Sequence, residues 1–463
     1  MNLVLFNKDI RMFDHQPLAE AAKIGEVLPL YVVEPSFWSE TGLSARHFQF
    51  VLESLEELSL QIQERGGQLF FAIGEIEAVL QELLKEYESL TLYVHKETIL
   101  KRSIGKWLDK NSQKMFTYGP EYENVSDKGF KSRWAASLKE PVIDPPKKIQ
   151  IPAKIPELLF TDFKKLRNFK MKGSNIRFGQ QGGEIKALET LESFLENRFV
   201  NYIINHDKPL PSSFSSSRLS AYLTWGNISE RVIFQKTNER LQTCSDGEQR
   251  QLEEFLSKLY LRAKIIHLAK EYPVNAEMSA LRKTWKEEWY QRWADGKTGI
   301  PIIDAAMRSL HKTGWLNFNL RGMVISFICN TLLLDCKKPS MALGELFLDF
   351  EPAIHNYYVE KQAGLSGKQK VKWINPIKIG KQHDPDGAFI RRYVPELSKV
   401  PVEFIHEPWL YPGFYKLGYP TPMVDVIKMN KHAKLQYEKD INKENAVHSS
   451  KKDGDTEQLT FDL

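Results

Sequence analysis

The sequence is poor in cysteine. Cys244, Cys329 and Cys336 are the only cysteines among 463 residues. Their spacing matches neither a disulfide framework nor the paired ligands of a metal centre. We therefore predict no metal site, and we expect the cysteines to be small residues of the core.

Long apolar runs and a strong excess of one charge are also missing. The most apolar stretch, residues 323–334, is too short to span a bilayer and contains Asn330. The apolar residues after Met1 end at Lys8 and Asp9, which is not the pattern of a secretory signal. Lys and Arg number 64 against 59 Asp and Glu, a balance that permits nucleic-acid binding without requiring it. We expect a soluble, cytoplasmic, monomeric protein with no membrane partner.

The first part of the chain alternates strand and helix patterns. A chain of this length has room for about two or three domains. Strands are predicted over residues 2–6, 27–34, 68–73 and 90–94, with helices over 17–24, 45–65 and 76–87 between them. This alternation predicts an α/β domain with a doubly wound parallel sheet over residues 1–125.

Three further segments follow. Residues 126–172 are basic and proline-rich, as in PPKK at 145–148, and indicate an interdomain linker on the surface. Residues 173–435 have mostly helical patterns and predict a larger all-α domain. Residues 436–463 are polar and charged, so we expect a disordered tail.

The stretch from residue 293 to 364 carries the densest signals. A turn, GKTGIP, places Pro301 in the first turn of a helix that Gly314 ends. A second, almost wholly apolar helix is predicted from about residue 320 to 334, and such a helix lies deep in a domain. Arg321 near its start needs an acidic partner or a ligand, because a lone buried charge is costly. Asp349 is the nearest plausible carboxylate.

These motifs, in their order and spacing, resemble the flavin-binding half of the photolyase and cryptochrome superfamily. The matching segments are DGKTG (295–299), DAAMR (304–308), GW (314–315), NP (375–376), DPDG (384–387) and FIRRYVPEL (389–397). NKDIRMFD (7–14) and the leucine-rich helix after Ser44 resemble the amino-terminal domain of the same family. The resemblance implies an FAD-binding all-α domain. EPAIH (351–355) resembles a divergent bacterial subgroup, and the carboxy-terminal cysteines of the iron–sulfur branch are missing.

The resemblance also implies which residues hold FAD. The segment SSSRLS falls where the family holds the pyrophosphate, and hydroxyls with free N–H groups at a helix start suit phosphate oxygens. By itself a serine run would be an ordinary loop and helix cap. The implied FAD-binding residues are Tyr202, Ser216, Ser217, Arg218, Leu219, Ser220, Arg262, Arg321, Asp349, Glu351 and His355.

Ungapped alignment places His355 opposite flavin N5, and a shift of one residue would place Asn356 there. These two residues are the candidates for a catalytic role. A histidine at this place would exchange a proton with the flavin near neutral pH. The alternative is a structural histidine held by hydrogen bonds.

The pocket that receives a damaged base pair departs from the family pattern. Leu261 and Lys258 stand where a tryptophan and an acidic residue are usual, and Phe318, with Asn317 beside it, stands at the usual asparagine. These replacements lack the groups that hold and protonate a cyclobutane dimer. Apolar and basic side chains still suit base stacking and phosphate contacts.

The tryptophan relay of the family is interrupted as well. Val359 falls at the position nearest the flavin and Cys336 at the middle one. Trp285 or Trp289 matches the outer position. Tyr357, Tyr358 and Trp373 are candidates for another route, although aromatic residues of a helical domain mostly serve packing.

We therefore expect a blue-light-absorbing flavoprotein, cryptochrome-like, with affinity for DNA and an altered repair pocket. The alternative is a DNA photolyase that donates an electron from reduced FAD to a lesion, and a scaffold without FAD is a third reading. The α/β domain is expected either to hold an antenna pigment of the folate or deazaflavin type or to act as a scaffold only. The last six residues, 458–463, faintly resemble peptides that dock on bacterial sliding clamps.

Overall fold

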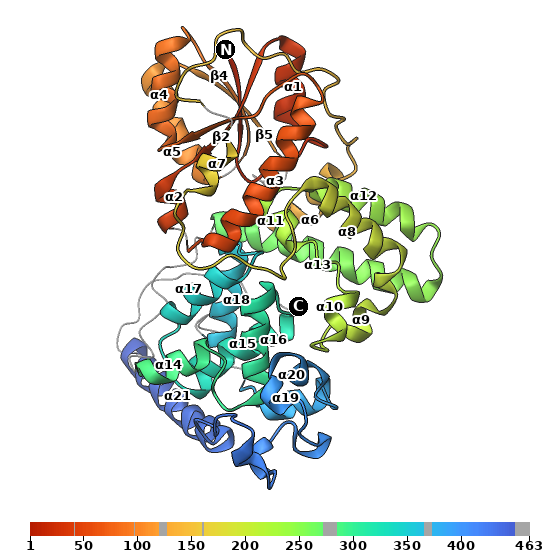
Figure 1. The fold of residues 1–463 in the computed structure, drawn as a ribbon, viewed down its shortest axis with the longest axis vertical. Coiled ribbons are helices and arrows are strands. Elements are labelled where there is room, and N and C mark those ends of the chain that lie inside the picture. The colour runs from red at the N-terminus through yellow and green to blue at the C-terminus, as the bar shows by residue number, and fades with distance from the viewer. Residues whose placement is uncertain are drawn as a thin grey trace.

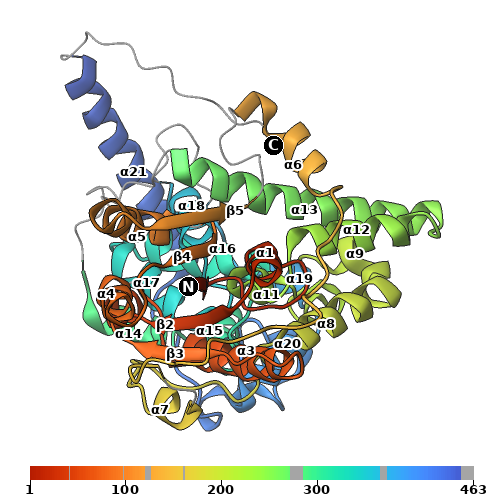
Figure 2. The same cartoon turned by 90° about the horizontal axis from the view of Figure 1, so that it is seen from above.

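The computed structural model describes residues 1–40, 42–96, 98–119, 127–159, 162–271, 285–364 and 373–449. In Figure 1 an α/β part lies above a larger helical part, and Figure 2 looks down on the α/β part. Among the described residues, no helix has the length and apolar character needed to cross a membrane.

The α/β part is a five-stranded parallel sheet in the order β3-β2-β1-β4-β5. In the register of the central strand, Val4 pairs with Pro29 on one side and with Tyr93 on the other. The strands are β1 (Asn2–Phe6), β2 (Val27–Val33), β3 (Phe70–Ile73), β4 (Thr91–His95) and β5 (Lys114–Tyr118). The predicted doubly wound α/β domain is confirmed.

Helices cover both faces of this sheet. They are α1 (Gln16–Ile24), α2 (Pro35–Glu40), α3 (Ala45–Gln63), α4 (Ile76–Glu86) and α5 (Thr98–Asn111). Because side chains alternate along a strand, Leu3 and Leu5 pack with α4 and α5, while Val4 and Phe6 pack into the core that includes α1 and α3. That second core continues into the helical part, so the two parts share one apolar interior.

The rest of the chain is helical, as predicted. Its helices are α6 (Asp127–Ser137), α7 (Phe163–Arg167), α8 (Glu184–Glu196), η2 (Arg198–Asn201), α9 (Tyr202–Asn205), α10 (Pro211–Ser215), α11 (Ser220–Trp225), α12 (Glu230–Leu241), α13 (Asp246–Glu271), α14 (Glu287–Ala294), α15 (Pro301–Thr313), α16 (Phe318–Ser326), η3 (Phe327–Thr331), α17 (Lys337–Leu346), α18 (Pro352–Ala363), α19 (Pro376–His383), α20 (Ala388–Tyr393), η4 (Pro395–Leu397), η5 (Val402–Phe404), η6 (Pro408–Leu410), η7 (Phe414–Lys416) and α21 (Val426–Ser449).

The predicted linker is only partly a surface connector. Phe130, Trp134 and Leu138, spaced four residues apart on and just after α6, are buried against the helical part. The indole Nε1–H of Trp134 donates to Glu230 at 3.3 Å. The basic and proline-rich composition of this segment obscured the apolar face that α6 packs inward.

The apolar helix predicted over residues 320–334 is shorter than predicted, and its last turn is π-helical instead of α-helical. Gly314 ends α15 with a φ of 68°, as predicted. The next helix, α16, begins at Phe318 and passes into a wider π-helical turn, η3, at Phe327. The residues of both are almost all buried, so the deep position was correctly predicted.

The predicted disordered tail is partly wrong. Helix α21 runs to Ser449, and it packs Val426 and Ala433 into the interior. This packing nucleates a helix that lysine, glutamate and glutamine, all good helix formers, then extend. Residues 450–463, including the segment that resembles a clamp-docking peptide, lie outside the described residues.

Candidate functional site

A cavity of about 460 Å³ opens inside the helical part. Its walls come from the segment α9–α11, from α13, from residues 315–325 and from residues 343–362. It is lined by Tyr202, His206, Ser212, Ser215, Ser216, Ser217, Ser220, Thr224, Lys258, Leu261, Arg262, Ile265, Trp315, Leu316, Asn317, Phe318, Arg321, Gly322, Ile325, Leu343, Phe347, Asp349, Phe350, Glu351, Ile354, His355, Tyr357, Tyr358, Val359, Lys361 and Gln362. A cavity of this size is typical of a cofactor site.

A serine-rich loop between α10 and α11 forms one wall. The guanidinium of Arg198 donates to the carbonyls of Ser216 and Ser217, which fixes the backbone of the loop. The side-chain oxygen of Ser216 is buried and has no hydrogen-bond partner. A buried hydroxyl without a partner is costly, so this atom is suited to a ligand oxygen that enters the cavity.

Two of the predicted FAD-binding residues lie behind this wall rather than in it. Leu219 is buried in the core. Arg218 has a φ of 60°, and its guanidinium lies 4.1 Å from the ring centre of Trp315, which lines the cavity. Burial lowers the pKa of Arg218 to about 10. Arg218 therefore supports Trp315, and it is not among the residues that line the cavity.

The predicted pairing of Arg321 with Asp349 is present. The Nη2 atom of Arg321 donates to both carboxylate oxygens, at 2.9 and 2.7 Å. Its Nε–H donates to the carbonyl of Leu316, and its guanidinium lies over the ring of Phe347. Burial alone would raise the pKa of Asp349, but Arg321 holds it below its usual range. Asp349 is therefore a fixed anion in the cavity wall.

A second pair of charges lies further along the same wall. Glu351 Oε2 is 3.3 Å from the ammonium of Lys8, which belongs to the loop after β1. Arg262, on α13, donates to Glu230 at 3.2 Å. Burial would raise the pKa of Glu351, but Lys8 and then Arg262 lower it. Lys8 was not predicted as a site residue, because nothing local connects it with Glu351.

Of the two candidates for the position at flavin N5, only His355 lines the cavity; Asn356 does not. Nε2 of His355 lies 3.0 Å from both the carbonyl and the hydroxyl oxygen of Ser340. Burial lowers the pKa of His355 to about 4. A neutral ring that donates from Nε2 to the carbonyl keeps Nδ1 unprotonated, so at neutral pH this histidine is a hydrogen-bond acceptor rather than an acid.

The four residues predicted for the substrate pocket all line the cavity, but two are already engaged. Lys258 forms an ion pair with Glu254 at 2.7 Å. Asn317 caps α16 by accepting from the N–H of Leu320, and its amide donates to Ser212. Leu261 is the apolar member of the set.

The fourth, Phe318, is 42% exposed and packs edge-on against Tyr358, with ring centres 4.8 Å apart. The opening of the cavity is therefore aromatic. Lys361, which also lines the cavity, places its ammonium 5.8 Å from the ring centre of Tyr357.

The aromatic residues predicted for electron transfer fall into two groups. Tyr357 and Tyr358 line the cavity, with ring centres 5.2 Å apart. Trp285, Trp289 and Trp373 do not line it. Trp289 lies on α14 with the ammonium of Lys286 over its ring, and Trp373 packs against Tyr437.

A row of ring contacts leads from Trp285 into the core, and the sequence analysis did not predict it. Its ring centre lies 5.2 Å from that of Tyr290, which lies 6.1 Å from that of the fully buried Trp293. The indole of Trp293 donates to the carbonyl of Val324 on α16.

The α/β part holds the loop that carries the two cavity carboxylates. From α3 and its cap, Ser44 donates to the carbonyl of Glu345, Arg46 to that of Leu346, and His47 to that of Phe347. Figure 1 shows α3 reaching down from the sheet toward α17 and α18. The loop between these helices is thus fixed from the other half of the molecule.

This lining fits a large anionic dinucleotide. The partnerless Ser216 hydroxyl and the neighbouring Ser217 and Ser220 suit phosphate oxygens, and the aromatic and apolar residues suit a flat ring system. Arg262 and Arg321 supply positive charge beside them.

Comparison with known proteins agrees with this fit. A family model described as the FAD binding domain of DNA photolyase matches residues 255–439, and one described as DNA photolyase matches residues 2–104. The deoxyribodipyrimidine photo-lyase of Alkalihalophilus pseudofirmus is 24% identical over 94% of this chain and 97% of its own length. Cryptochrome DASH of Gloeobacter violaceus is 26% identical over 92% of this chain and 93% of its own.

A solved bacterial class III photolyase from Agrobacterium tumefaciens superimposes with a TM-score of 0.83 at 25% identity, covering 95% of this chain and 98% of its own. The DNA photolyase model matches the α/β part and the FAD binding model matches the helical part. The chain belongs to the photolyase and cryptochrome superfamily, and its helical half is an FAD-binding domain of that family.

Proposed function

We propose that this protein is a cryptochrome-like flavoprotein that absorbs blue light through FAD and binds DNA at the mouth of the cavity. The observation that carries the proposal is how the residues predicted for the substrate pocket are engaged within the protein. The amide of Asn317 caps a helix, Lys258 is paired with Glu254, and Leu261 has no polar group. Asn317 and Leu261 therefore offer no free polar group to hold a cyclobutane dimer, and Lys258 replaces the usual acidic group by a cation.

The charge state of the cavity supports the same proposal. Asp349 and Glu351, the acidic residues among the described lining, are each held ionised by a cation. His355 is neutral near pH 7, with a pKa lowered by burial to about 4. None of these three residues therefore carries an acidic proton near pH 7 that it could donate to a lesion. When bound, FAD supplies the light absorption and the electron chemistry.

A DNA photolyase is the second candidate, and the aromatic opening favours it. Phe318 is 42% exposed beside Tyr358, and Arg262 and Lys361 also line the cavity. Aromatic faces stack on bases, and cations attract phosphates, so this opening suits a nucleotide turned out of a duplex.

The purified protein should show flavin absorption bands that bleach under blue light with a thiol reductant. Binding to ultraviolet-irradiated and to intact DNA of one sequence, at matched salt, then separates the candidates. Equal affinity and no light-driven loss of cyclobutane dimers support the cryptochrome-like function. Preference for irradiated DNA with light-driven repair would establish the photolyase, and a protein that no added FAD makes yellow would refute both.

A second pigment in the α/β domain is a separate proposal. Ligands of doubly wound sheets bind at the carboxyl ends of the strands, where the strand order reverses. Here that point lies between β1 and β4. An absorption band that remains after FAD has been accounted for, and that is lost on extraction, would support a folate or deazaflavin pigment.

A further inference from the structure

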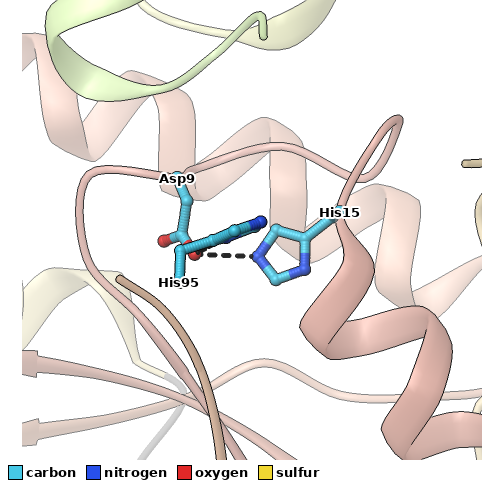
Figure 3. A group of neighbouring side chains, drawn as sticks. All are labelled: Asp9, His15 and His95. Carbon is cyan, nitrogen blue, oxygen red and sulfur yellow. Dashed lines mark hydrogen bonds and ion pairs between the residues drawn. The ribbon is translucent and has the colours of Figure 1, made fainter. Parts of the chain in front are cut away.

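The loop after β1 is anchored unusually firmly. The carboxylate of Asp9 accepts from the N–H of Asn7 at 2.7 Å, and its Oδ2 lies 3.0 Å from His15 Nε2 and 2.6 Å from His95 Nδ1. Figure 3 shows both imidazoles beside this carboxylate. His95 ends β4 and His15 precedes α1, so three segments of the α/β domain meet at Asp9.

These three side chains also have the spacing of a metal site, with ligand atoms all within 4.8 Å of one another. Their hydrogen bonds favour an anchor instead. Nδ1 of His15 accepts from the N–H of Leu18, so the proton of the neutral ring lies on Nε2 and points at Asp9. A metal-bound histidine normally donates from its second nitrogen, which is the opposite arrangement. Burial lowers the pKa of His15 to about 4, which keeps the ring neutral.

The same loop crosses to the helical half. The N–H of Ile10 donates to the carbonyl of Trp225, the amide of Asn227 donates to the carbonyl of Ile10, and Arg11 donates to the carbonyl of Gly226. These bonds surround the carboxyl end of α11, whose first residue, Ser220, lines the cavity. The backbone that follows Lys8 is therefore bonded to the helical half, while Asn7 before it is bonded to Asp9.

Lys8 uses this fixed position to reach into the cavity wall. Its ammonium lies 3.3 Å from Glu351 Oε2, and the two side chains are only 17% and 18% exposed. The other charge that acts on Glu351 is Arg262 of α13, which is itself paired with Glu230 of α12. Lys8 is thus the principal counter-charge of a buried carboxylate, supplied by a different domain.

We propose that Lys8 is a positioning residue of the FAD cavity, which holds Glu351 ionised and in place and so makes cofactor affinity independent of pH around neutrality. This proposal rests on the proposed FAD-binding role of the cavity. It states how a residue of the α/β domain controls the affinity of the cavity for FAD. A buried carboxylate that loses its counter-charge takes up a proton instead.

The test substitutes Lys8→Met, with Lys8→Arg as the conservative variant and Lys23→Met as the matched control. Lys23 forms an exposed ion pair with Glu20 on α1 of the same domain. Calorimetric titration with FAD, in two buffers of different ionisation enthalpy, gives both the dissociation constant and the number of protons taken up. It is run near pH 6 and near pH 8.

In the wild type, in Lys8→Arg and in Lys23→Met, we expect a dissociation constant that changes less than about threefold between these pH values. In Lys8→Met we expect FAD to bind about tenfold more weakly near pH 8 than near pH 6, with proton uptake on binding. The reason is that an uncompensated carboxylate opposes an anionic ligand, and protonation at the lower pH removes that charge. Adding Glu351→Gln to Lys8→Met should abolish the pH dependence.

The same coupling is measurable without FAD. In Lys8→Met the folded-state pKa of Glu351 rises above its unfolded value, so the stability contribution is lost as the pH rises. Urea unfolding of the apoprotein should therefore show Lys8→Met, but not Lys8→Met/Glu351→Gln, losing stability between these pH values relative to the wild type.

Two results would overturn the proposal. One is wild-type FAD affinity in Lys8→Met at both pH values. The other is weak, pH-independent binding that Glu351→Gln does not relieve, which would indicate general damage to the interface. A wild type that binds no FAD would instead refute the proposed function, and the apoprotein unfolding data would still decide whether Lys8 controls Glu351.

Discussion

A single nitrogen of Arg321, Nη2, bonds both carboxylate oxygens of Asp349, at 2.9 and 2.7 Å. This geometry leaves the other terminal nitrogen of the guanidinium outside the pair. Arg321 is 27% exposed in its side chain, whereas Asp349 is 8% exposed. The arginine therefore joins a buried anion on one side with the cavity on the other.

Replacing Asp349 by Asn should leave Arg321 without its counter-charge. We expect FAD affinity to fall at least about tenfold and the free energy of unfolding to fall by about 3 kcal/mol, as for other buried pairs that lose one partner. Flavin fluorescence titration and urea unfolding measure the two effects. Glu189→Gln, which breaks an exposed pair with Lys186, should change stability by less than about 0.5 kcal/mol. Full FAD occupancy in Asp349→Asn would contradict the role given to the pair.

Ser216→Ala should separate stability from binding. The buried Ser216 hydroxyl has no partner in the protein, so its removal should leave the apoprotein equally stable or more stable by up to about 1 kcal/mol. FAD affinity should fall by about five- to tenfold through the loss of one hydrogen bond. Thermal unfolding of the apoprotein and FAD titration measure these. Ser213→Ala, whose hydroxyl donates to the Leu210 carbonyl outside the cavity lining, should leave FAD affinity unchanged.

The protein should lose stability as the pH falls below about 6.5. Burial lowers the pKa of both His47 and His355 from 6.5 to about 4. A histidine whose folded-state pKa lies below its unfolded value takes up its proton in the unfolded chain first. Its contribution to stability is therefore present above pH 6.5 and is lost as the pH falls to 4. Each such histidine adds a slope of up to about 1.4 kcal/mol per pH unit.

Denaturant unfolding at a series of pH values measures this slope. In His355→Gln the slope below pH 6.5 should be shallower by that amount, even though the substitution itself changes the absolute stability. Above pH 7 the two curves should run parallel. An unchanged slope below pH 6.5 would show that His355 does not titrate in this way.

Gly226→Ala should disrupt the contact between the two halves. Gly226 has a φ of 70°, and an added Cβ would lie 2.0 Å from the carbonyl oxygen of Lys8. Left-handed strain alone costs about 1–2 kcal/mol, and the backbone clash adds to it. We expect a loss of more than about 2 kcal/mol of unfolding free energy together with weaker FAD binding. Gly105→Ala, inside α5 with no atom near the new Cβ, should be neutral or stabilising.

The sequence was most informative where a local rule applies. Short apolar strand patterns that alternate with helix patterns predicted the parallel sheet, because helices between the strands cover both faces of such a sheet. The left-handed end of α15 followed from Gly314, since glycine adopts that backbone without strain. The partner of Arg321 followed from the cost of burying an unpaired charge.

Other features depend on distance or register and could not be predicted. Lys8 and Glu351 are 343 residues apart, and only the folded chain brings them together. The choice between His355 and Asn356 is one of helical register, which a short motif does not decide. The apolar face of α6 was hidden by the charges around it. Arg218 belongs by motif to the serine loop, but its guanidinium lies over the ring of Trp315.

The bonds from Ser44, Arg46 and His47 to the end of α17 and to Phe347 have a consequence for exchanging parts between relatives. Each of these bonds ends on a main-chain carbonyl, so it depends on the donor side chain and not on the identity of the residue that accepts it. A chimaera in which the first half comes from another family member would keep these three bonds only where that half supplies equivalent side chains at the start of α3. Residues 345–347 can then vary without loss of these bonds, whereas Asp349 and Glu351, further along the loop, act through their own side chains.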